Sequence, residues 1–257
     1  MLEKRRITAF IFERSEAEKR QYERRLDSVT QLAEAGNTAE VGKILDLPEA
    51  VVKLSLECVG DKRRKSNLLI GDEVKRITHF SHMARVAFMM RYFFPEDKSG
   101  RLLAMLHDIK EEAQEGQENR YRESALAKQI DLLTEEDVTE EELTSAAQEL
   151  PKDYDAKYVA TYRKYIRRLH DNWDQLGAME LCDRLDTSSS YEYLLNPKYK
   201  NRMPFKALES LGRIWATLNG YSNEVVDIIK ENSRKWFNRF KITERQVEEA
   251  ARLFTDK

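Results

Sequence analysis

Apolar side chains recur at intervals of three and four residues along almost the whole chain, and this spacing limits the fold more than any other feature. Tyr22, Leu26, Val29 and Leu32 form one such stripe. A stripe with this spacing covers one face of an α-helix, whereas half-buried strands alternate every second residue. Glycine and proline, which interrupt helices, number only nine and five in 257 residues. The sequence therefore predicts an all-α protein.

Turn and capping residues divide the chain into expected helices. Gly36 ends the first helix, Pro48 opens one that reaches Gly60, and Pro95 stops a long helix over 74–94. Further helix starts are expected at Asn37 with Glu40, at Ser99, and at the Thr-Glu-Glu stretches that begin at residues 134 and 139. A basic loop, "GDKRRKSNLLIGDE", precedes the long helix.

Composition excludes several classes of protein. The formal net charge of −2, from 44 basic and 46 acidic residues, gives no overall field that would gather nucleic acid. Nothing at the N-terminus resembles a signal peptide, and no stretch approaches the about 18 apolar residues of a membrane span. With only Cys58 and Cys182, the chain predicts neither a disulfide framework nor a cysteine zinc site. We expect a cytoplasmic protein without a membrane partner.

The stretch "RLLAMLHDIKEE" places His107 beside Asp108, with Glu111 and Glu112 one helical turn later. Acidic groups this close repel one another unless a positive charge lies among them. Either a bound cation or a solvated, acidic helix end accounts for the pattern. A second His-Asp pair at 170–171 follows a basic, tyrosine-rich helix, and an exposed helix end explains it.

A metal site needs further ligands, and two other apolar helices offer them. The segment "ITHFSHMARVAFMM" contains His79 and His82, three residues apart on one helix face, and "AMELCDRLD" contains Asp183. Taken singly, such a histidine is more often a core residue and such an aspartate a salt-bridge partner. Together with His107 and Asp108 they form the donor set of a mixed nitrogen and oxygen site for a divalent transition ion.

The order His82, then His107 and Asp108, then Asp183 resembles the HD-domain metal-dependent phosphohydrolases. Within them, "HMARVAFMM", "LLAMLHDIKEE", "ALAKQIDLLTE", "AMELCDRLDT" and "DKRRKSN" are similar to segments of the guanosine polyphosphate, or (p)ppGpp, hydrolases. The resemblance covers roughly residues 60–200. It implies an HD-domain helical bundle over 60–200, an N-terminal helical extension over 1–59, and C-terminal helices over 201–257 that complete the same domain.

The resemblance also implies roles for individual residues. His82, His107, Asp108 and Asp183 would bind one divalent ion, Mn²⁺ by preference. Glu111 and Glu112 would be the catalytic acids, and Arg64, Lys65 and Arg184 would bind the substrate. Glu112 stands where the family usually has aspartate, and Thr187 where it usually has asparagine. Because the family's lead-in to the first ligand is replaced here by "RITHFSH", His79 remains an alternative to His82 as that ligand.

Three functions follow from the sequence. The first is hydrolysis of a guanosine 3'-diphosphate ester such as (p)ppGpp, with release of pyrophosphate. The second is an HD-type 5'-nucleotidase acting on deoxynucleoside monophosphates. The third is a non-catalytic helical protein that binds a nucleotide or another partner in the same pocket. In the first two, the partner is a small-molecule nucleotide, and the sequence leaves a homo-oligomer open.

Overall fold

Helices form nearly all of the regular structure, so the predicted all-α fold class is confirmed. The computed structural model describes residues 15–64, 68–70, 73–117, 119–151, 154–190 and 203–255. The α-helices there are α1 (Glu16–Glu34), α2 (Thr38–Leu45), α3 (Glu49–Val59), α4 (His79–Phe93), α5 (Lys98–Leu106), α6 (Ile109–Glu112), α7 (Ala127–Leu133), α8 (Glu140–Glu149), α9 (Ala156–Asp171), α10 (Trp173–Ser190), α11 (Met203–Thr217), α12 (Glu224–Phe240) and α13 (Glu244–Arg252). An antiparallel hairpin of β1 (Leu68–Ile70) and β2 (Glu73–Lys75) and a 3₁₀ turn, η1 (Arg120–Glu123), complete them.

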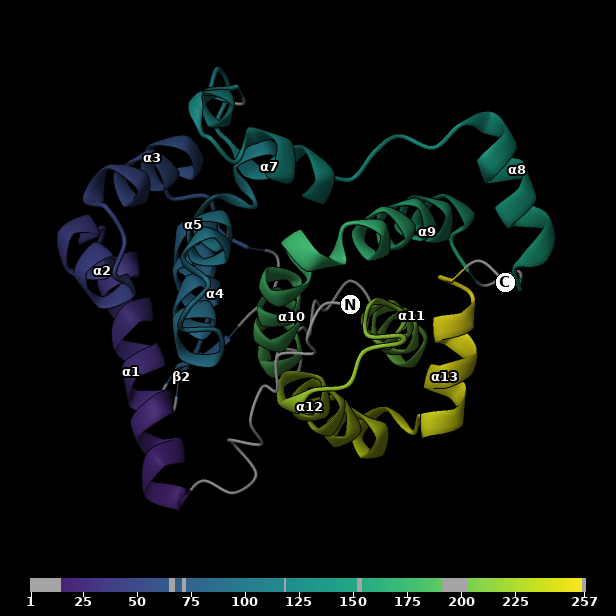
Figure 1. Ribbon diagram of the computed structural model, residues 1–257. Helices are drawn as coiled ribbons and strands as arrows, with labels where there is room; N and C mark the ends of the chain where they lie inside the picture. Colours follow the sequence, from purple (N-terminus) through teal and green to yellow (C-terminus); the bar gives the residue numbers. More distant parts are fainter. Residues whose placement is uncertain are drawn as a thin grey trace.

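Helix α4 is buried along almost its entire length. Every residue from His79 to Met90 is buried. Its neighbours α1, α2, α5 and α10 pack around it (Figure 1). Because α4 has almost no face toward water, its polar side chains must find partners inside the protein.

Helix α10 lies between two groups of helices. It contacts α4 and α5 on one side and α9 and α12 on the other, while α11 packs against α13 (Figure 1). The buried apolar side chains form one connected cluster that extends from Leu26 in α1 to Phe254 after α13. One hydrophobic core thus runs through all three of the predicted regions, whose boundaries near residues 60 and 200 remain predictions.

Two of the predicted helix starts are confirmed by side-chain caps. The Asn37 side chain accepts a hydrogen bond from the N–H of Glu40 at 3.2 Å. Thr139 and Glu142 each accept a hydrogen bond from the other's backbone N–H, which forms a capping box at the start of α8. Such caps satisfy donors that the first turn of a helix leaves without partners.

The helix expected over 74–94 begins only at His79, so the first part of that prediction is wrong. Residues 73–75 form β2, whose backbone pairs with β1. Thr78 then caps α4, and its hydroxyl accepts a hydrogen bond from the N–H of Ser81 at 3.1 Å. A three-residue strand is too short to show an alternating pattern in the sequence.

Two further predicted helix starts are wrong. Asp97, rather than Ser99, caps α5, and its carboxylate accepts a hydrogen bond from the N–H of Gly100 at 2.7 Å. Thr134 follows the end of α7, where its hydroxyl donates to the carbonyl of Ile130 at 2.9 Å. In both places several capping residues occur close together, and the local sequence does not distinguish among them.

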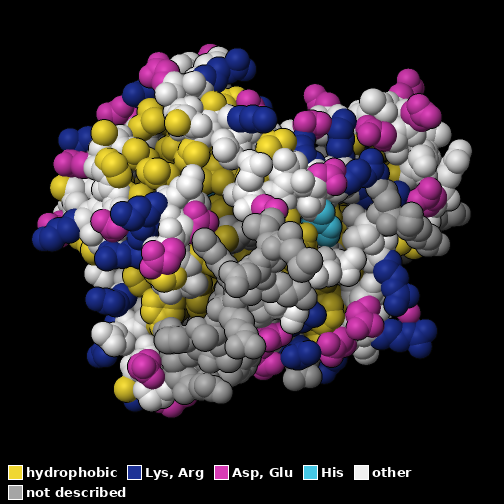
Figure 2. All heavy atoms as spheres, viewed as in Figure 1, with side chains coloured by type: hydrophobic (Ala, Val, Ile, Leu, Met, Phe, Trp, Pro, Cys, Tyr) yellow, Lys and Arg dark blue, Asp and Glu magenta, His cyan; other side chains and the backbone are white. Residues whose placement is uncertain are grey.

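None of the described helices could span a membrane, and charged side chains of both signs are mixed on the face that Figure 2 shows. Within the described ranges, none of the helices has the length and apolar character that a bilayer crossing requires. Figure 2 shows lysine and arginine side chains scattered among aspartate and glutamate on one face of the molecule. This mixture matches the small formal net charge of −2.

The packing of α11 against α13 depends on Gly212. A Cβ atom at this position would lie 2.7 Å from the Cβ of Ala250 and 2.9 Å from its carbonyl carbon, which is closer than such atoms pack. We expect Gly212→Ala to destabilise the protein by about 1–3 kcal/mol, although alanine by itself favours a helix over glycine by about 1 kcal/mol. Thermal unfolding followed by circular dichroism measures this effect. A melting temperature at or above that of the wild type would contradict the close packing.

Candidate metal centre

Three side chains bring their ligand atoms together at the ends of two buried helices. His82 lies in the first turn of α4, His107 follows the last residue of α5, and Asp108 precedes α6. One ligand atom from each lies within 4.8 Å of the other two. The centres of the two imidazole rings are 5.3 Å apart. Two nitrogen donors and one carboxylate at this spacing can bind a divalent transition ion.

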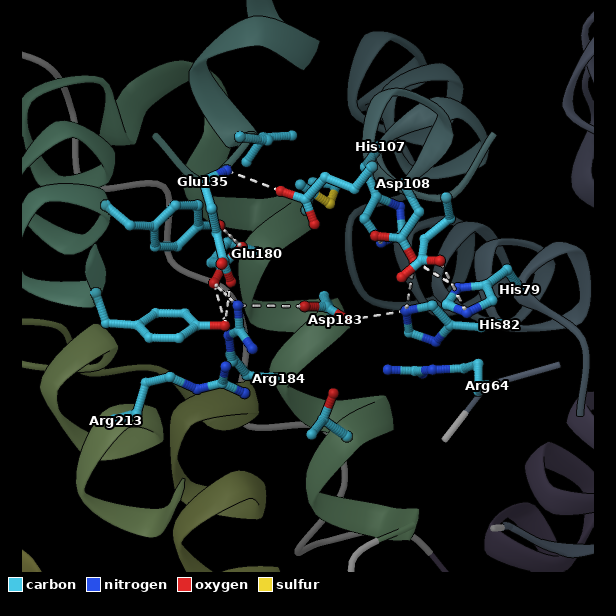
Figure 3. Close-up of a pocket in the computed structure, with 17 residues that line it drawn as sticks. Arg64, His79, His82, His107, Asp108, Glu135, Glu180, Asp183, Arg184 and Arg213 are labelled. Atoms are coloured by element: carbon cyan, nitrogen blue, oxygen red, sulfur yellow. Dashed lines mark hydrogen bonds and ion pairs between the residues drawn. The ribbon is translucent and has the colours of Figure 1, made fainter. Parts of the chain in front are cut away.

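Asp183 of α10 adjoins this cluster. Its Oδ1 lies 3.0 Å from Nε2 of His82, and the residue is buried. The contact arises because α10 packs on both α4 and α5. In Figure 3, Asp183 lies between the histidines and the opposite wall of a pocket. The structure therefore places Asp183 in contact with His82, beside the three predicted ligands whose atoms converge.

The Nε2 atom of His107 fits a cation. Nδ1 of this ring lies 2.8 Å from the carbonyl oxygen of Ala104 and donates to it, so that in the neutral ring the lone pair is on Nε2. Among the described residues, Nε2 is buried without a hydrogen-bond partner, although Oδ1 of Asp108 lies 3.2 Å away. A lone pair that faces a carboxylate is repelled unless a positive charge lies near both. The residues present therefore fit a divalent cation.

The electrostatics of the cluster also favour positive charge. Burial alone would raise the pKa of Asp108, but the neighbouring histidines and Arg64 hold it well below its usual range. Burial and Arg64 would lower the pKa of His82, but hydrogen bonds to Asp183 and Asp186 outweigh them and raise it. The neighbouring carboxylates thus favour positive charge on the His82 ring, and the neighbouring basic groups favour negative charge on Asp108.

His79, the alternative ligand, lies at the edge of the cluster. Its Nδ1 is 3.5 Å from Oδ2 of Asp108, and its Nε2 is 3.5 Å from Oε2 of Glu112. His79 is not among the three residues whose ligand atoms converge, whereas His82 is. The geometry thus favours His82 as the ligand from α4.

The two predicted catalytic acids lie in different environments. Glu111 Oε1 accepts a hydrogen bond from the N–H of Glu135 at 2.8 Å. Although Glu111 as a residue is exposed, desolvation of its carboxyl, together with the nearby Asp108 and two other glutamates, raises its pKa to about 7. Glu112 Oε2 lies 2.6 Å from Nζ of Lys62 and thus forms an ion pair. Glu111 is the acid that can take up or release a proton near neutral pH.

One pocket, with a volume of ≈ 250 Å³, connects the cluster to a second set of polar residues. In Figure 3, Arg64, the histidines and Asp108 lie on one side, and Glu135, Glu180, Arg184 and Arg213 lie on the other. The remaining lining residues are Glu111, Glu112, Leu133, Tyr162, Tyr165, Met179, Asp183 and Thr187. All predicted site residues that the structure describes line this pocket, and Lys65 lies outside the described residues.

The two described arginines of the predicted substrate site differ in their partners. Arg64 Nη1 lies 3.7 Å from Oδ2 of Asp186, a distance longer than a hydrogen bond. Arg184 donates from Nε to Oε1 of Glu180 at 2.6 Å, and its Nη2 lies 3.4 Å from Oδ2 of Asp183. Arg184 therefore balances buried carboxylates of its own helix, while Arg64 is held less tightly.

Sequence reasoning missed three residues of the far wall. The guanidinium of Arg213 lies 4.4 Å from the centre of the Tyr162 ring, and the Tyr162 hydroxyl donates to Glu135. Tyr162 lies on α9 between Tyr158 and Tyr165, and aromatic residues at this spacing are more typical of a core face than of a binding site. Arg213 and Glu135 carry no local signal, because only the packing of α11 and the α7–α8 connection bring them to the pocket.

No protein-family model, curated protein or solved structure matches this chain. Any function must therefore be inferred from the pocket itself. The pocket combines a cluster suited to a cation, a carboxyl group with a pKa of about 7 and several guanidinium groups. Hydrolysis of a phosphate ester is one reaction that groups of these three kinds can support.

The second His-Asp pair takes no part in the pocket. His170 lies in the last turn of α9, as predicted, and its Nε2 is 3.2 Å from the carbonyl oxygen of Thr217. The rings of Trp173 and Tyr221 lie 5.8 Å and 5.4 Å from the His170 ring. A packing role accounts for this histidine.

The raised pKa of Glu111 predicts how stability depends on pH. Between the ordinary pKa of 4.5 and the folded-state pKa of about 7, the folded protein binds more protons at Glu111 than the unfolded chain does. Stability contributed by this group should therefore fall as pH rises through this window. Glu111→Gln cannot ionise, and we expect it to lose less stability over the same window.

Urea unfolding of chelator-treated protein at about pH 5 and about pH 8 measures this difference. Glu141→Gln, an exposed glutamate of α8, is the control and should behave as the wild type does. If the stability of Glu111→Gln depended on pH as that of the wild type does, a raised pKa at Glu111 would be excluded.

Proposed function

We propose that this protein is a metal-dependent phosphohydrolase that hydrolyses a guanosine 3'-diphosphate ester such as (p)ppGpp and releases pyrophosphate. The observation that carries the proposal is the buried Nε2 of His107, which lies beside His82 and Asp108 and has no hydrogen-bond partner among the described residues. A divalent cation is the simplest group that would satisfy this atom and the surrounding carboxylates. The resemblance of the same residues to the HD-domain phosphohydrolases points to the same chemistry.

His82, His107, Asp108 and Asp183 would hold one ion, and Mn²⁺ suits their mixture of imidazole and carboxylate donors. The chemistry that such an ion supplies when bound is a lowered pKa of a water molecule and polarisation of the phosphoryl oxygen under attack. The buried imidazoles and carboxylates come from α4, α10 and the α5–α6 junction, so the packing of these helices sets the donor geometry before any ligand arrives.

Glu111 is placed to handle the proton of the attacking water. Its pKa of about 7 allows it to accept a proton at neutral pH and to release it again. In the hydrolysis, the water oxygen joins the phosphorus atom, the bond from phosphorus to the ribose oxygen breaks, and a proton ends on the leaving oxygen. The N–H of Glu135 orients one oxygen of Glu111, which leaves the other toward the pocket.

The two sides of the pocket suit different parts of a nucleotide. Arg64, on the side of the cluster, can pair with phosphate oxygens. On the far side the two arginines, Arg184 and Arg213, are matched by the two glutamates, Glu135 and Glu180. Because the positive and negative charges of this side are equal in number, and a tyrosine ring lies beside them, this side suits a neutral group with both hydrogen-bond donors and acceptors, such as guanine. We therefore place the phosphates beside the cluster and the nucleoside on the far side.

A specific observation favours a second candidate function. The cavity volume of ≈ 250 Å³ lies just below the range of about 300–1,000 Å³ that is usual for small-molecule sites. A deoxynucleoside monophosphate is smaller than (p)ppGpp and would fit this volume more easily. An HD-type 5'-nucleotidase is therefore the alternative, and a protein that binds a nucleotide without turning it over is the third candidate.

A phosphatase screen with added Mn²⁺ tests the proposal. We expect the wild type to release pyrophosphate from (p)ppGpp, because the cluster would activate water beside the 3'-diphosphate. Asp108→Ala removes a central carboxylate, so we expect it to lose both Mn²⁺ and turnover while its helical circular dichroism is retained. The assay measures phosphate and pyrophosphate separately, and metal analysis accompanies it.

Each contrary result points to a different alternative. Release of inorganic phosphate from deoxynucleoside monophosphates, with (p)ppGpp left intact, would favour the 5'-nucleotidase. Nucleotide binding without turnover or metal would favour the non-catalytic protein. Full activity in Asp108→Ala would rule out this site.

Arg213 tests the placement of the nucleoside. A guanidinium that donates to the base contributes about 1.5–3 kcal/mol to binding, so we expect Arg213→Ala to raise KM by about 10- to 100-fold. The value of kcat and the affinity for Mn²⁺ should change little, because Arg213 lies across the pocket from the cluster (Figure 3). Arg234→Ala, an exposed arginine of α12, is the matched control. A fall in kcat at constant KM would contradict a role in binding the nucleoside.

A further inference from the structure

Asp186 contacts the side of the His82 ring that faces away from the cluster. Its Oδ2 lies 2.7 Å from Nδ1 of His82, and the residue is completely buried. Asp183, three residues earlier on α10, lies 3.0 Å from Nε2 of the same ring. Residues three apart share one face of a helix, so α10 presents two carboxylates that hold the imidazole from both sides.

The contact of Asp186 decides which nitrogen of His82 can bind a ligand. When Nδ1–H donates to Asp186, the lone pair of the neutral ring lies on Nε2, which faces Asp183 and Asp108. A carboxylate behind a ligating histidine fixes its tautomer and the orientation of its ring. His107 reaches the same state through its hydrogen bond to Ala104. Both rings thus present Nε2 to one place.

The second oxygen of Asp186 leads to the N-terminal helix. Its Oδ1 accepts a hydrogen bond from Nε of Arg85 at 2.8 Å, and Nη1 of Arg85 donates to the hydroxyl of Thr30 at 2.9 Å. Thr30 belongs to α1, and its hydroxyl donates in turn to the carbonyl of Leu26. These side chains are all buried. An unbroken row of hydrogen bonds therefore links α1, through α4 and α10, to the imidazole of His82.

The same N-terminal helix also holds the start of α4. Glu34, the last residue of α1, accepts hydrogen bonds from the N–H of Thr78 at 2.7 Å and from the hydroxyls of Thr78 and Ser81. These residues form the cap and first turn of α4, which also carries His82. Two separate contacts from α1 therefore fix the segment that positions the imidazole.

We propose that Asp186 is a positioning residue of the metal centre and that Arg85 and Thr30 extend its support to α1. The charge of Arg85 offsets that of the buried Asp186 carboxylate, which would otherwise be costly to bury. The N-terminal helix is then a part of the metal centre rather than an appendage. This inference rests on the metal binding proposed above.

Asp186→Asn tests the role of the carboxylate. One amide oxygen cannot accept from both His82 and Arg85, and the amide nitrogen is a donor that would face one of these two donors. Loss of such a supporting contact typically weakens metal binding by about 10- to 100-fold, and we expect a loss of this size for Mn²⁺. Titration of Mn²⁺ by electron paramagnetic resonance measures it without reference to activity, and the visible spectrum of bound Co²⁺ should change as well.

Thr30→Val and Thr217→Val form a matched pair in case Asp186→Asn does not fold. Both threonines are buried in helices and donate to the carbonyl oxygen four residues earlier. Only Thr30 also accepts from Arg85. We expect Thr30→Val to weaken Mn²⁺ binding several-fold and Thr217→Val to leave it unchanged.

The outcomes separate this inference from the proposed function. A wild type that binds no Mn²⁺ would overturn both. A wild type that binds Mn²⁺, with unchanged affinity in Asp186→Asn or equal affinities in the two threonine variants, would leave the proposed function standing. In that case Asp186 would serve stability alone, and the positioning role would be wrong.

Discussion

An imidazole in the interior of a protein needs partners for two nitrogens without water, and in His82 both nitrogens face carboxylates from one helix. Asp183 and Asp186 hold the ring from opposite sides, at 3.0 Å and 2.7 Å. Each carboxylate is buried and has an arginine near it, Arg184 for the first and Arg85 for the second. The packing of α4 against α10 is therefore fixed by polar contacts as well as by apolar ones. The positions of Asp108 and Asp183 beside the two histidines depend on this packing.

The distribution of charge across the pocket separates two tasks. Beside the histidines, the carboxylates of Asp183 and Asp186 raise the pKa of His82, while burial, aided by nearby carboxylates, raises that of Glu111. Across the pocket, arginine and glutamate side chains occur in equal number. One side thus favours a cation, while the other favours a polar group without net charge. A nucleotide that spans the pocket would meet both conditions.

Local spacing explains what could be predicted from the sequence. His107, Asp108 and Glu111 lie within five consecutive residues, so their proximity follows from local spacing, even though α5 ends at Leu106 and α6 begins at Ile109. The all-α class likewise follows from the recurrence of apolar residues at intervals of three and four. In contrast, the hairpin before His79 is stabilised by backbone pairing, which leaves no trace in side-chain order. Arg213 comes to the pocket only through the packing of α11. Asp186 did offer a signal, since it follows Asp183 by three residues, but only the structure shows that both face His82.

The row of hydrogen bonds from Thr30 to His82 determines when the metal centre can form during translation. The segment from α1 to the start of α6 leaves the ribosome first, and it already contains His82, His107 and Asp108. Asp183 and Asp186 follow much later, after the whole of α9. Until α10 docks, His82 lacks the carboxylate that selects its tautomer, and Arg85 lacks the partner for its charge. A nascent chain would thus acquire a competent centre only once α10 has folded against the helices made before it.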